Sequence, residues 1–442
     1  MDLARVALSR VKEPVSKESI YEAVKEAVSL LGGVEKFIKP GERVLINPNF
    51  VSPRKPPVTT DPRTVRAVAL LIKEAGAHPI IGEGCSAMTH WWREGMDTMG
   101  VMKTLGIDKV AEEVGAELFA FDKGGKFFSK MVKIPDASLT EKLELAEIGF
   151  EVDKIVPVPV LKTSMEGGGI TACIKGFHAF VNAFTDRIRF HRSDLWYKLV
   201  DVVKAYRDKI AFCVVDAVTA MEGDGPIHGL PVDMRLIIAG DDPVATDSIA
   251  AVTIGYKAPH IEIGPIAIAN AQGIGVGDPE KIEVLGERIE DVQRNFIKAT
   301  CEVVEGWFPQ AIIKDGASCR VCKAWIKFTL YMLKDSNFFE EFDKTGKKLY
   351  FFVGMEPPFP QDLDEVRKLA ERGIPIIFGS CAMHSLKNFY WVIAQGNLRE
   401  KILMMPGCPP FAVQQQANAI IERSGIKLKE EEVEEAFKYV PT

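Results

Sequence analysis

The 442-residue sequence lacks the features that mark membrane, secreted and nucleic-acid-binding proteins. No window approaches the roughly 18 apolar residues of a membrane-spanning helix, and residues 1–20 contain no uninterrupted apolar stretch of a signal peptide. The formal net charge is −6, and Lys and Arg form neither basic tails nor clustered runs. We therefore expect a cytoplasmic protein that binds neither nucleic acid nor a membrane.

The spacing of the cysteines argues against a disulfide framework. The chain has eight cysteines, of which only Cys319 and Cys322 form a C-x-x-C pair. In a chain of this size without a secretion signal, this pattern indicates a reducing compartment and metal or redox chemistry. Cys213 lies inside an apolar run and is expected in the core, and Cys173 and Cys301 also fit ordinary buried thiols.

Apolar, strand-like runs alternate with amphipathic helical patterns along most of the chain. The strand-like runs of the first part are 5–9, 43–48, 78–83, 118–121, 154–161, 210–215, 234–239 and 281–285. The helical patterns include 17–31, 61–75, 193–206 and 243–253. Because several strands are continuous apolar runs, the pattern predicts an α/β fold with a doubly wound, mostly parallel sheet covered on both faces. We expect this larger domain to span residues 1–295.

A second, smaller α/β domain is predicted for residues 296–442. Residues 293–318 are expected to form a connecting helix and loop. The strand candidates are 348–353, 374–378 and 401–405, and the helix candidates are 362–372, 386–394 and 411–424. Two domains also agree with the length, which exceeds what one ordinary hydrophobic core accommodates.

Four cysteines of the smaller domain are expected to converge. Cys319 and Cys322 lie just before a helix, whereas Cys381 and Cys408 each follow a predicted strand. In a parallel sheet the carboxyl ends of neighbouring strands lie at one edge, which is the edge where ligands bind. We expect the C-x-x-C loop to fold across this edge, so that the four thiolates ligate one metal centre.

Four thiolates suit an iron–sulfur cluster or zinc. Structural zinc sites usually use two local cysteine pairs, whereas here one pair joins two distant single cysteines. This spacing favours a 4Fe–4S cluster as the cofactor, with zinc and unligated thiols as the alternatives. His384, three residues after Cys381, is a candidate neighbouring group or alternative ligand.

A glycine run in the larger domain has the composition of an anion site. It precedes a helical stretch, where backbone N–H groups and the helix dipole attract negative charge. The candidate contacts for a phosphate or carboxylate are Thr163, Gly168, Gly169, Thr171 and Lys175. Lys162 and His178 are catalytic candidates beside them, and Lys162 adds a second positive charge. A glycine-rich turn with surface lysines is the alternative, because P-loop and dinucleotide fingerprints are absent.

Polar residues also gather where other predicted strands end. Asp216 and Glu222 lie in a glycine-rich segment after the strand 210–215 and are candidates for acid and base, or for holding a cation. Asn47, Asn49 and Glu83 follow two further strands and are expected to contact the substrate. The alternative for the segment at Asp216 is a turn in which Asp side chains bond their own backbone.

The chain resembles a known family over residues 1–290. The similarity is carried by the segments 44–49 with 60–62, 159–162 with 171–175, 216–226, 239–247 and 269–275. These segments are similar to the family catalogued as domain of unknown function 362. The resemblance implies an iron–sulfur-associated protein of undefined reaction. Many members carry a dense ferredoxin-type cysteine run, and in this chain the four C-terminal cysteines would take its place.

These observations lead to one main hypothesis and two alternatives. We expect an iron–sulfur enzyme, redox in its chemistry, that binds a small anionic organic substrate between its two domains. The first alternative is a metal-dependent racemase or hydro-lyase, since the two-domain arrangement is similar to that of lactate racemase. The second is a non-catalytic electron-transfer or metal-assembly protein. The expected protein partners are an electron-donor protein and, in a homodimer, a second copy of the chain.

Overall fold

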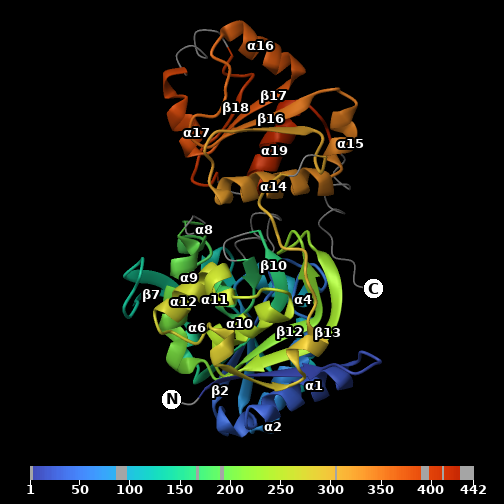
Figure 1. Cartoon of the computed structure of the whole chain (residues 1–442), viewed down its shortest axis with the longest axis vertical. Helices are drawn as coiled ribbons and strands as arrows, with labels where there is room; N and C mark the ends of the chain where they lie inside the picture. The colour runs from blue at the N-terminus through green and yellow to red at the C-terminus, as the bar shows by residue number, and fades with distance from the viewer. Residues whose placement is uncertain are drawn as a thin grey trace. The chain divides into compact units, whose positions relative to one another are not determined.

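A computed structural model describes residues 3–85, 97–165, 169–189, 194–303, 306–389, 398–410 and 413–428. The chain divides into two compact units, with the boundary between Ala299 and Thr300. Figure 1 shows both units, whose positions relative to one another are not determined. The predicted common substrate cleft between the two domains therefore stays a prediction.

A four-stranded, all-parallel sheet forms one part of the larger unit. Its strands, in spatial order, are β4 (Glu117–Ala120), β3 (His78–Glu83), β2 (Arg43–Pro48) and β9 (Lys154–Val158). The helices nearby in sequence are α1 (Lys17–Leu30), α2 (Pro62–Glu74), α4 (Thr98–Thr104) and α5 (Ile107–Val114). Because the strand order reverses between β2 and β9, this sheet has the switch point at which open α/β sheets bind ligands.

A six-stranded mixed sheet forms a second part of the larger unit. Its spatial order is β11 (Gly169–Thr171), β10 (Val160–Ser164), β12 (Cys213–Glu222), β13 (Leu230–Gly240), β1 (Ala4–Arg10) and β14 (Ile282–Gly286). The pairs β12–β13 and β1–β13 are antiparallel. The α/β class is confirmed, and the prediction of a single sheet for this unit is corrected to two large sheets with two further two-stranded ones.

The remaining elements of the larger unit are short hairpins and helices. The hairpins are β5 (Asp122–Lys123) with β6 (Lys126–Phe127), and β7 (Ser129–Lys133) with β8 (Lys142–Ala146). The helices are α6 (Ile148–Glu151), α7 (Cys173–Gly176), α8 (Asp186–Arg189), α9 (Leu195–Tyr206), α10 (Pro243–Thr253), α11 (Pro259–Glu262), α12 (Gly264–Ala271) and α13 (Ile289–Val292).

Alternate residues of the central strands enter two different hydrophobic cores. In β1, Val6 and Leu8 belong to one core and Ala7 to the other. In β13, Ile238 and Ile237 divide in the same way. Successive side chains of a strand point to opposite faces, so both faces of these strands are buried. This double burial explains the continuous apolar runs that the sequence shows.

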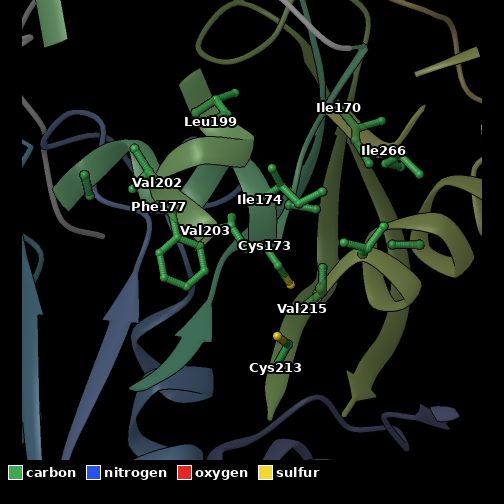
Figure 2. Packing of buried hydrophobic residues seen from close by; sticks show 14 of the residues in the cluster. Ile170, Cys173, Ile174, Phe177, Leu199, Val202, Val203, Cys213, Val215 and Ile266 are labelled. Atoms are coloured by element: carbon green, nitrogen blue, oxygen red, sulfur yellow. The ribbon is translucent and has the colours of Figure 1, made fainter. Parts of the chain in front are cut away.

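The first of these cores joins the mixed sheet to helices α7 and α9 (Figure 2). Cys213 of β12 and Cys173 of α7 are both fully buried, and their thiols form a hydrogen bond. Ile174 and Val203 pack in the same core. The prediction that Cys173 and Cys213 are ordinary core residues is confirmed.

A four-stranded parallel sheet forms the centre of the smaller unit. Its strands, in spatial order, are β15 (Ala311–Asp315), β16 (Lys348–Val353), β17 (Gly373–Phe378) and β18 (Leu403–Met405). Its helices are α14 (Arg320–Asp335), α15 (Phe338–Asp343), α16 (Leu363–Arg372), α17 (Ser380–Ser385) and α19 (Val413–Ser424). None of the helices found in the described ranges is long and apolar enough to span a membrane.

Two segments of the smaller unit differ from the prediction. The segment 293–318, predicted as a helix and loop, contains strand β15. The sequence did not predict this strand, because its apolar run is only three residues long and gives no clear periodicity. In place of a helix over 386–394, α17 ends at Ser385 and a 3₁₀ turn follows at Lys387–Phe389. Residues 390–394 lie outside the described part of the chain.

Truncating a residue of the larger unit's core tests this packing. Ile238 is fully buried in β13, so Ile238→Ala should lower the free energy of unfolding by about 2–5 kcal/mol. Ile261 is 73% exposed, so the control Ile261→Ala should change it by less than about 0.5 kcal/mol. Urea denaturation followed by circular dichroism measures both, and equal losses would contradict the packing described for Ile238.

Candidate functional site

Three segments of the smaller unit carry the four predicted metal ligands. Cys319 is the N-cap residue of α14, and Cys322 lies in the first turn of this helix. Cys381 lies in α17, which begins just after β17, and Cys408 follows β18. Because β17 and β18 pair in parallel, Cys381 and Cys408 follow neighbouring carboxyl ends of one sheet.

Backbone hydrogen bonds connect the loops after β17 and β18. The Gly379 N–H donates to Met405 O at 2.9 Å, and the Ser380 N–H donates to Gly407 O at 2.8 Å. The Gly407 N–H in turn donates to Ser380 Oγ at 3.2 Å. A Cβ atom added to Gly379 would lie 3.3 Å from Cys322 Sγ. The sulfur of Cys322 therefore lies against the junction of these two loops.

The four sulfurs also influence one another's ionisation. A hydrogen bond from the Cys322 thiol, with N–H groups of the first turn of α14, lowers the pKa of Cys319 to about 5. The same hydrogen bond, then burial and the negative charges of Cys319, Cys408 and Cys381, raise the pKa of Cys322 well above its usual value. The other three cysteines therefore all lie within electrostatic reach of Cys322. The lowered pKa of Cys319 favours its thiolate form, which is the form that ligates metals.

Exposure differs among the four cysteines. Cys319, Cys381 and Cys408 are exposed, whereas Cys322 is buried. In the ranges that the structure describes, no three His, Cys, Asp or Glu side chains already have the spacing of a single metal-ion site. A shared metal centre at these four cysteines therefore stays a prediction, as does a role for His384 beside it.

In the larger unit, Lys162 lies in a buried cage of protein oxygens. Its side chain is fully buried in β10. Its Nζ donates to Asn49 Oδ1 at 2.7 Å, to Val58 O at 2.8 Å and to Pro226 O at 3.4 Å. An ammonium group has three N–H donors, so an anion at Lys162 would have to replace one of these oxygens.

The predicted anion-binding glycine loop is a β-hairpin for the most part. Gly169 and Thr171 belong to β11, which pairs with β10 in antiparallel register and sets Thr171 opposite Lys162. The N–H groups that open α7 are occupied by a protein carboxylate, because Asp247 accepts from Cys173 at 2.6 Å and from the next residue at 2.9 Å. This corrects the prediction that free N–H groups at this helix start attract a ligand anion. Gly168 lies outside the described residues.

Three polar side chains lie on or beside the hairpin of β10 and β11. Lys175 is half-buried, and its Nζ donates to Ser164 Oγ at 2.8 Å. Thr171 is buried, and its Oγ1 has no hydrogen-bond partner among the described residues. Thr163 Oγ1 donates to Gly223 O at 2.7 Å and thereby joins β10 to the end of β12. Lys175 and Thr171 therefore remain the candidates for a ligand contact here.

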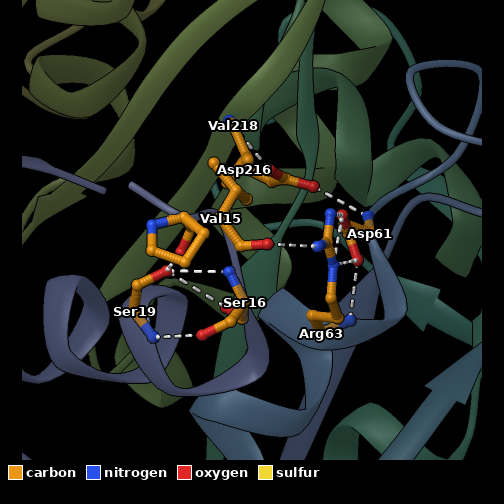
Figure 3. A network of polar contacts seen from close by, with 8 residues as sticks. Val15, Ser16, Ser19, Asp61, Arg63, Asp216 and Val218 are labelled. Atoms are coloured by element: carbon orange, nitrogen blue, oxygen red, sulfur yellow. Dashed lines mark hydrogen bonds and ion pairs between the residues drawn. The ribbon is translucent and has the colours of Figure 1, made fainter. Parts of the chain in front are cut away.

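Asp216 stabilises the start of α2 (Figure 3). Its Oδ2 accepts from the Asp61 N–H at 2.7 Å, and its Oδ1 accepts from the Val218 N–H at 3.1 Å. Asp61 is the N-cap residue of α2 and forms an ion pair with Arg63 at 2.7 Å. The guanidinium of Arg63 also donates to Val15 O at 3.3 Å. This network joins β12 to the segments before α1 and α2. The observed contacts of Asp216 therefore stabilise the fold.

Asp216 and Glu222 are too far apart to act as an acid and base pair. The segment predicted as a glycine-rich loop is part of β12 as far as Glu222, so Asp216 lies inside a strand. Six residues of strand separate the two by about 20 Å. Glu222 Oε2 instead accepts from the Ile297 N–H at 2.9 Å. The prediction of cooperating carboxylates is therefore corrected.

The remaining predicted residues of the larger unit are mostly buried. His178 Nε2 lies 3.1 Å from Nζ of Lys198, which is fully buried. Asn47 is buried at the end of β2, and its Nδ2 donates to Gly82 O at 3.0 Å. Glu83 is buried at the end of β3. Asn47 and Glu83 thus lie at the ligand edge of the parallel sheet, as predicted.

A buried polar cluster that no sequence motif predicted surrounds Glu83. Its other members are Cys85, Thr98, Asp122 and Arg187, which lie in or directly after four different elements. Their separation in the sequence left no motif by which they were recognisable.

A cavity of about 880 Å³ opens elsewhere on the larger unit. Its charged lining residues are Arg5, Lys36, Arg207, Asp241, Asp242 and Glu283. None of the predicted site residues lines this cavity.

The ionisation of Asp216 provides a test of its buried position. Burial, with a smaller effect of the charge of Asp61, raises the pKa of Asp216 to about 7, compared with roughly 3.9 in an unfolded chain. The native protein then binds more protons than the unfolded chain between about pH 4 and pH 7, so the free energy of unfolding falls as the pH rises through this window. Asp216→Asn should make the fall of the unfolding free energy with pH less steep. The change in slope corresponds to a difference of up to about one bound proton between the native and unfolded states.

Urea denaturation at several pH values within this window measures the effect. The control is Asp208→Asn, which changes an exposed carboxyl group of the same unit and should leave the dependence unchanged. A dependence as steep in Asp216→Asn as in the unmodified protein would contradict the prediction.

The similarity to two known proteins covers about half of this chain in each case. The thylakoid-associated protein sll1697 of Synechocystis sp. (strain ATCC 27184 / PCC 6803 / Kazusa) is 27% identical over 244 residues, which are 52% of this chain and 68% of that protein. The lactate racemase apoprotein from Thermoanaerobacterium thermosaccharolyticum is a solved structure with 15% identity and a TM-score of 0.30. The alignment with it covers 48% of this chain and 50% of that chain, and a similarity this low carries no functional argument.

The family match lies over the parallel sheet and most of the mixed sheet. Residues 44–252 match the model of the family described as "Domain of unknown function (DUF362)". The matched range includes Asn47, Lys162 and Asp216, three of the residues on which the resemblance was predicted. The predicted resemblance to this family is thus confirmed, as a match over residues 44–252.

Proposed function

We propose that the smaller unit binds a 4Fe–4S cluster through Cys319, Cys322, Cys381 and Cys408, in an enzyme that acts on a small anionic organic substrate. The observation that supports this proposal is the position of the Cys322 sulfur. It lies against Gly379, where the loops leading to Cys381 and Cys408 are hydrogen-bonded to each other.

The chemistry of the donor set fits the proposed cofactor. Four thiols on three segments supply soft ligands, which suit iron–sulfur clusters and zinc. Two single cysteines on loops at one sheet edge, together with one helix-start pair, favour the cluster over zinc, which usually uses two local pairs. A bound cluster supplies either electron transfer or a Lewis-acid iron.

The larger unit would bind the substrate in this proposal. Its parallel sheet places Asn47 and Glu83 at the carboxyl ends of neighbouring strands, the edge at which such sheets bind ligands. Lys175 is the candidate contact for the anionic group, since it is half-buried beside the hairpin β10–β11. His178, next to the buried Lys198, is the candidate for moving a proton.

Two other functions would use parts of the same machinery. A metal-dependent racemase or hydro-lyase would use the metal centre as a Lewis acid instead of an electron carrier. A non-catalytic electron-transfer or metal-assembly protein would need the cysteines but not the polar edge of the larger unit.

The cytoplasmic location, the electron-donor partner and the homodimer stay predictions.

Metal analysis after anaerobic purification tests the cofactor. We expect about four iron and four acid-labile sulfide per chain, with a brown colour, and no stoichiometric zinc. Cys408→Ser should lose most of this iron, because a ligand thiolate is removed. The matched control is Cys301→Ser, which changes a half-buried cysteine of the same unit and should keep the iron.

Full iron content in Cys408→Ser, or stoichiometric zinc without sulfide in the unmodified protein, would contradict the cluster proposal. Circular dichroism of each variant tests whether iron is lost through unfolding. The larger unit contains none of the four cysteines and should stay folded in each variant.

A pair of glycine substitutions tests the position of the Cys322 sulfur. Gly379 and Gly346 both have a positive φ, of 89° and 67°, so Ala is strained at either position. Only at Gly379 would the added Cβ approach Cys322 Sγ, at 3.3 Å, whereas nothing lies within 4 Å at Gly346. Gly379→Ala should therefore lower the iron content more than Gly346→Ala. Equal iron content in the two variants, measured anaerobically, would reject this placement of the sulfur.

A further inference from the structure

The buried polar cluster around Glu83 lies at the ligand edge of the parallel sheet. Glu83 ends β3, Thr98 begins α4 and Asp122 begins β5, and each is at most 3% exposed. The Thr98 hydroxyl donates to Asp122, and Cys85 Sγ lies 3.5 Å from Thr98 Oγ1. Arg187 of α8 is 6% exposed and completes the cluster.

The guanidinium of Arg187 donates to backbone oxygens. Its acceptors are the carbonyl groups of Gly84, Ala179 and Val181. Its positive charge still favours the ionised form of Glu83, which opposes the effect of burial on that carboxyl group. Arg187 therefore compensates part of the negative charge of the cluster.

One oxygen of Glu83 lacks a hydrogen-bond donor. The carboxyl group accepts from the Phe50 N–H and from the Cys85 thiol, but its Oε2 is buried and has no partner among the residues that the structure describes. A buried acceptor without a partner costs on the order of 1–3 kcal/mol, and more when it is charged. This cost is removed if a ligand donates a hydrogen bond to Oε2.

The charge of the cluster decides which donor fits best. The negative charge of Asp122 raises the pKa of Glu83, and among the described residues Arg187 is the cation that both carboxyl groups share. A neutral hydroxyl group would satisfy Oε2 but leave one buried charge uncompensated, which is costly. An ammonium group supplies both the N–H donor and the missing positive charge.

We propose that Glu83 binds the primary ammonium group of a small organic molecule at the carboxyl end of β3. This deepens the proposed function, on which it rests for the remainder of the ligand, because the anionic substrate would then also carry an ammonium group. The substrate class is that of small zwitterionic amino compounds.

Two salts of equal charge test the ammonium site. Methylammonium has three N–H donors, whereas tetramethylammonium has none, so the difference between them isolates the hydrogen bond to Oε2. We expect methylammonium chloride to raise the thermal unfolding midpoint of the full chain more than tetramethylammonium chloride does. In Glu83→Gln this difference should vanish, with an affinity for methylammonium at least about tenfold lower.

Asp247→Asn is the matched control for the variant. Asp247 is also a fully buried carboxyl group, but both of its oxygens accept from backbone N–H groups, so this variant should keep the difference between the two salts.

The pH gives a second test that needs no variant. Burial raises the pKa of Glu83 to about 7, so the difference should shrink as the pH falls from about 8 to about 6 and Glu83 is protonated.

Equal effects of the two salts on the unmodified protein would overturn the inference, as would an unchanged difference in Glu83→Gln or at the lower pH. Iron and sulfide content, measured on the same preparations, separates this result from the proposed function. Normal iron without a methylammonium effect rejects the ammonium site alone, whereas a methylammonium effect without iron rejects the cluster alone.

Discussion

The burial of both faces of the central strands is the constraint on which the larger unit depends. Ala7 and Leu8 are neighbours in β1, yet they pack into different hydrophobic cores, and the same holds for Ile237 and Ile238 in β13. Apolar side chains thus occupy both sides of the sheets, which leaves little place there for a polar group. Asn47 and Glu83, two of the polar residues that are buried in this unit, lie at the carboxyl ends of their strands.

The buried carboxyl groups of the larger unit are not equivalent. Asp216 and Asp247 accept from backbone N–H groups with both oxygens, so they hold the starts of α2 and α7 in place. Burial raises the pKa of both to about 7, because it disfavours the charged form. Glu83 is buried in the same way, but the donor for its second oxygen is missing from the described residues. The backbone N–H groups thus compensate for the burial of Asp216 and Asp247, whereas we propose that a ligand does so for Glu83.

The smaller unit uses parallel strand pairing for a different purpose. The register of β17 with β18 brings Gly379 and Gly407 together, although a long segment separates them in the sequence. The start of α14 adds Cys322 to this junction. Neither the C-x-x-C pair nor the two single cysteines would suffice as a ligand set, so the proposed metal centre depends on the folded sheet. The cores of the two units have no residue in common, which makes loss of metal separable from loss of the larger unit's fold.

The sequence by itself determined the α/β class, the family resemblance and the strand ends at which ligands are expected, because these follow from local periodicity and short motifs. It placed α10 and β16 at the observed residues, since their patterns are complete within a few turns or residues. Only the tertiary structure decided that β12 pairs antiparallel with β13, that Lys162 lies among buried oxygens and that Asp247 occupies the start of α7. Each of these depends on which distant segments meet, and the sequence around one residue carries no information about the partner that will satisfy its charge or hydrogen bonds.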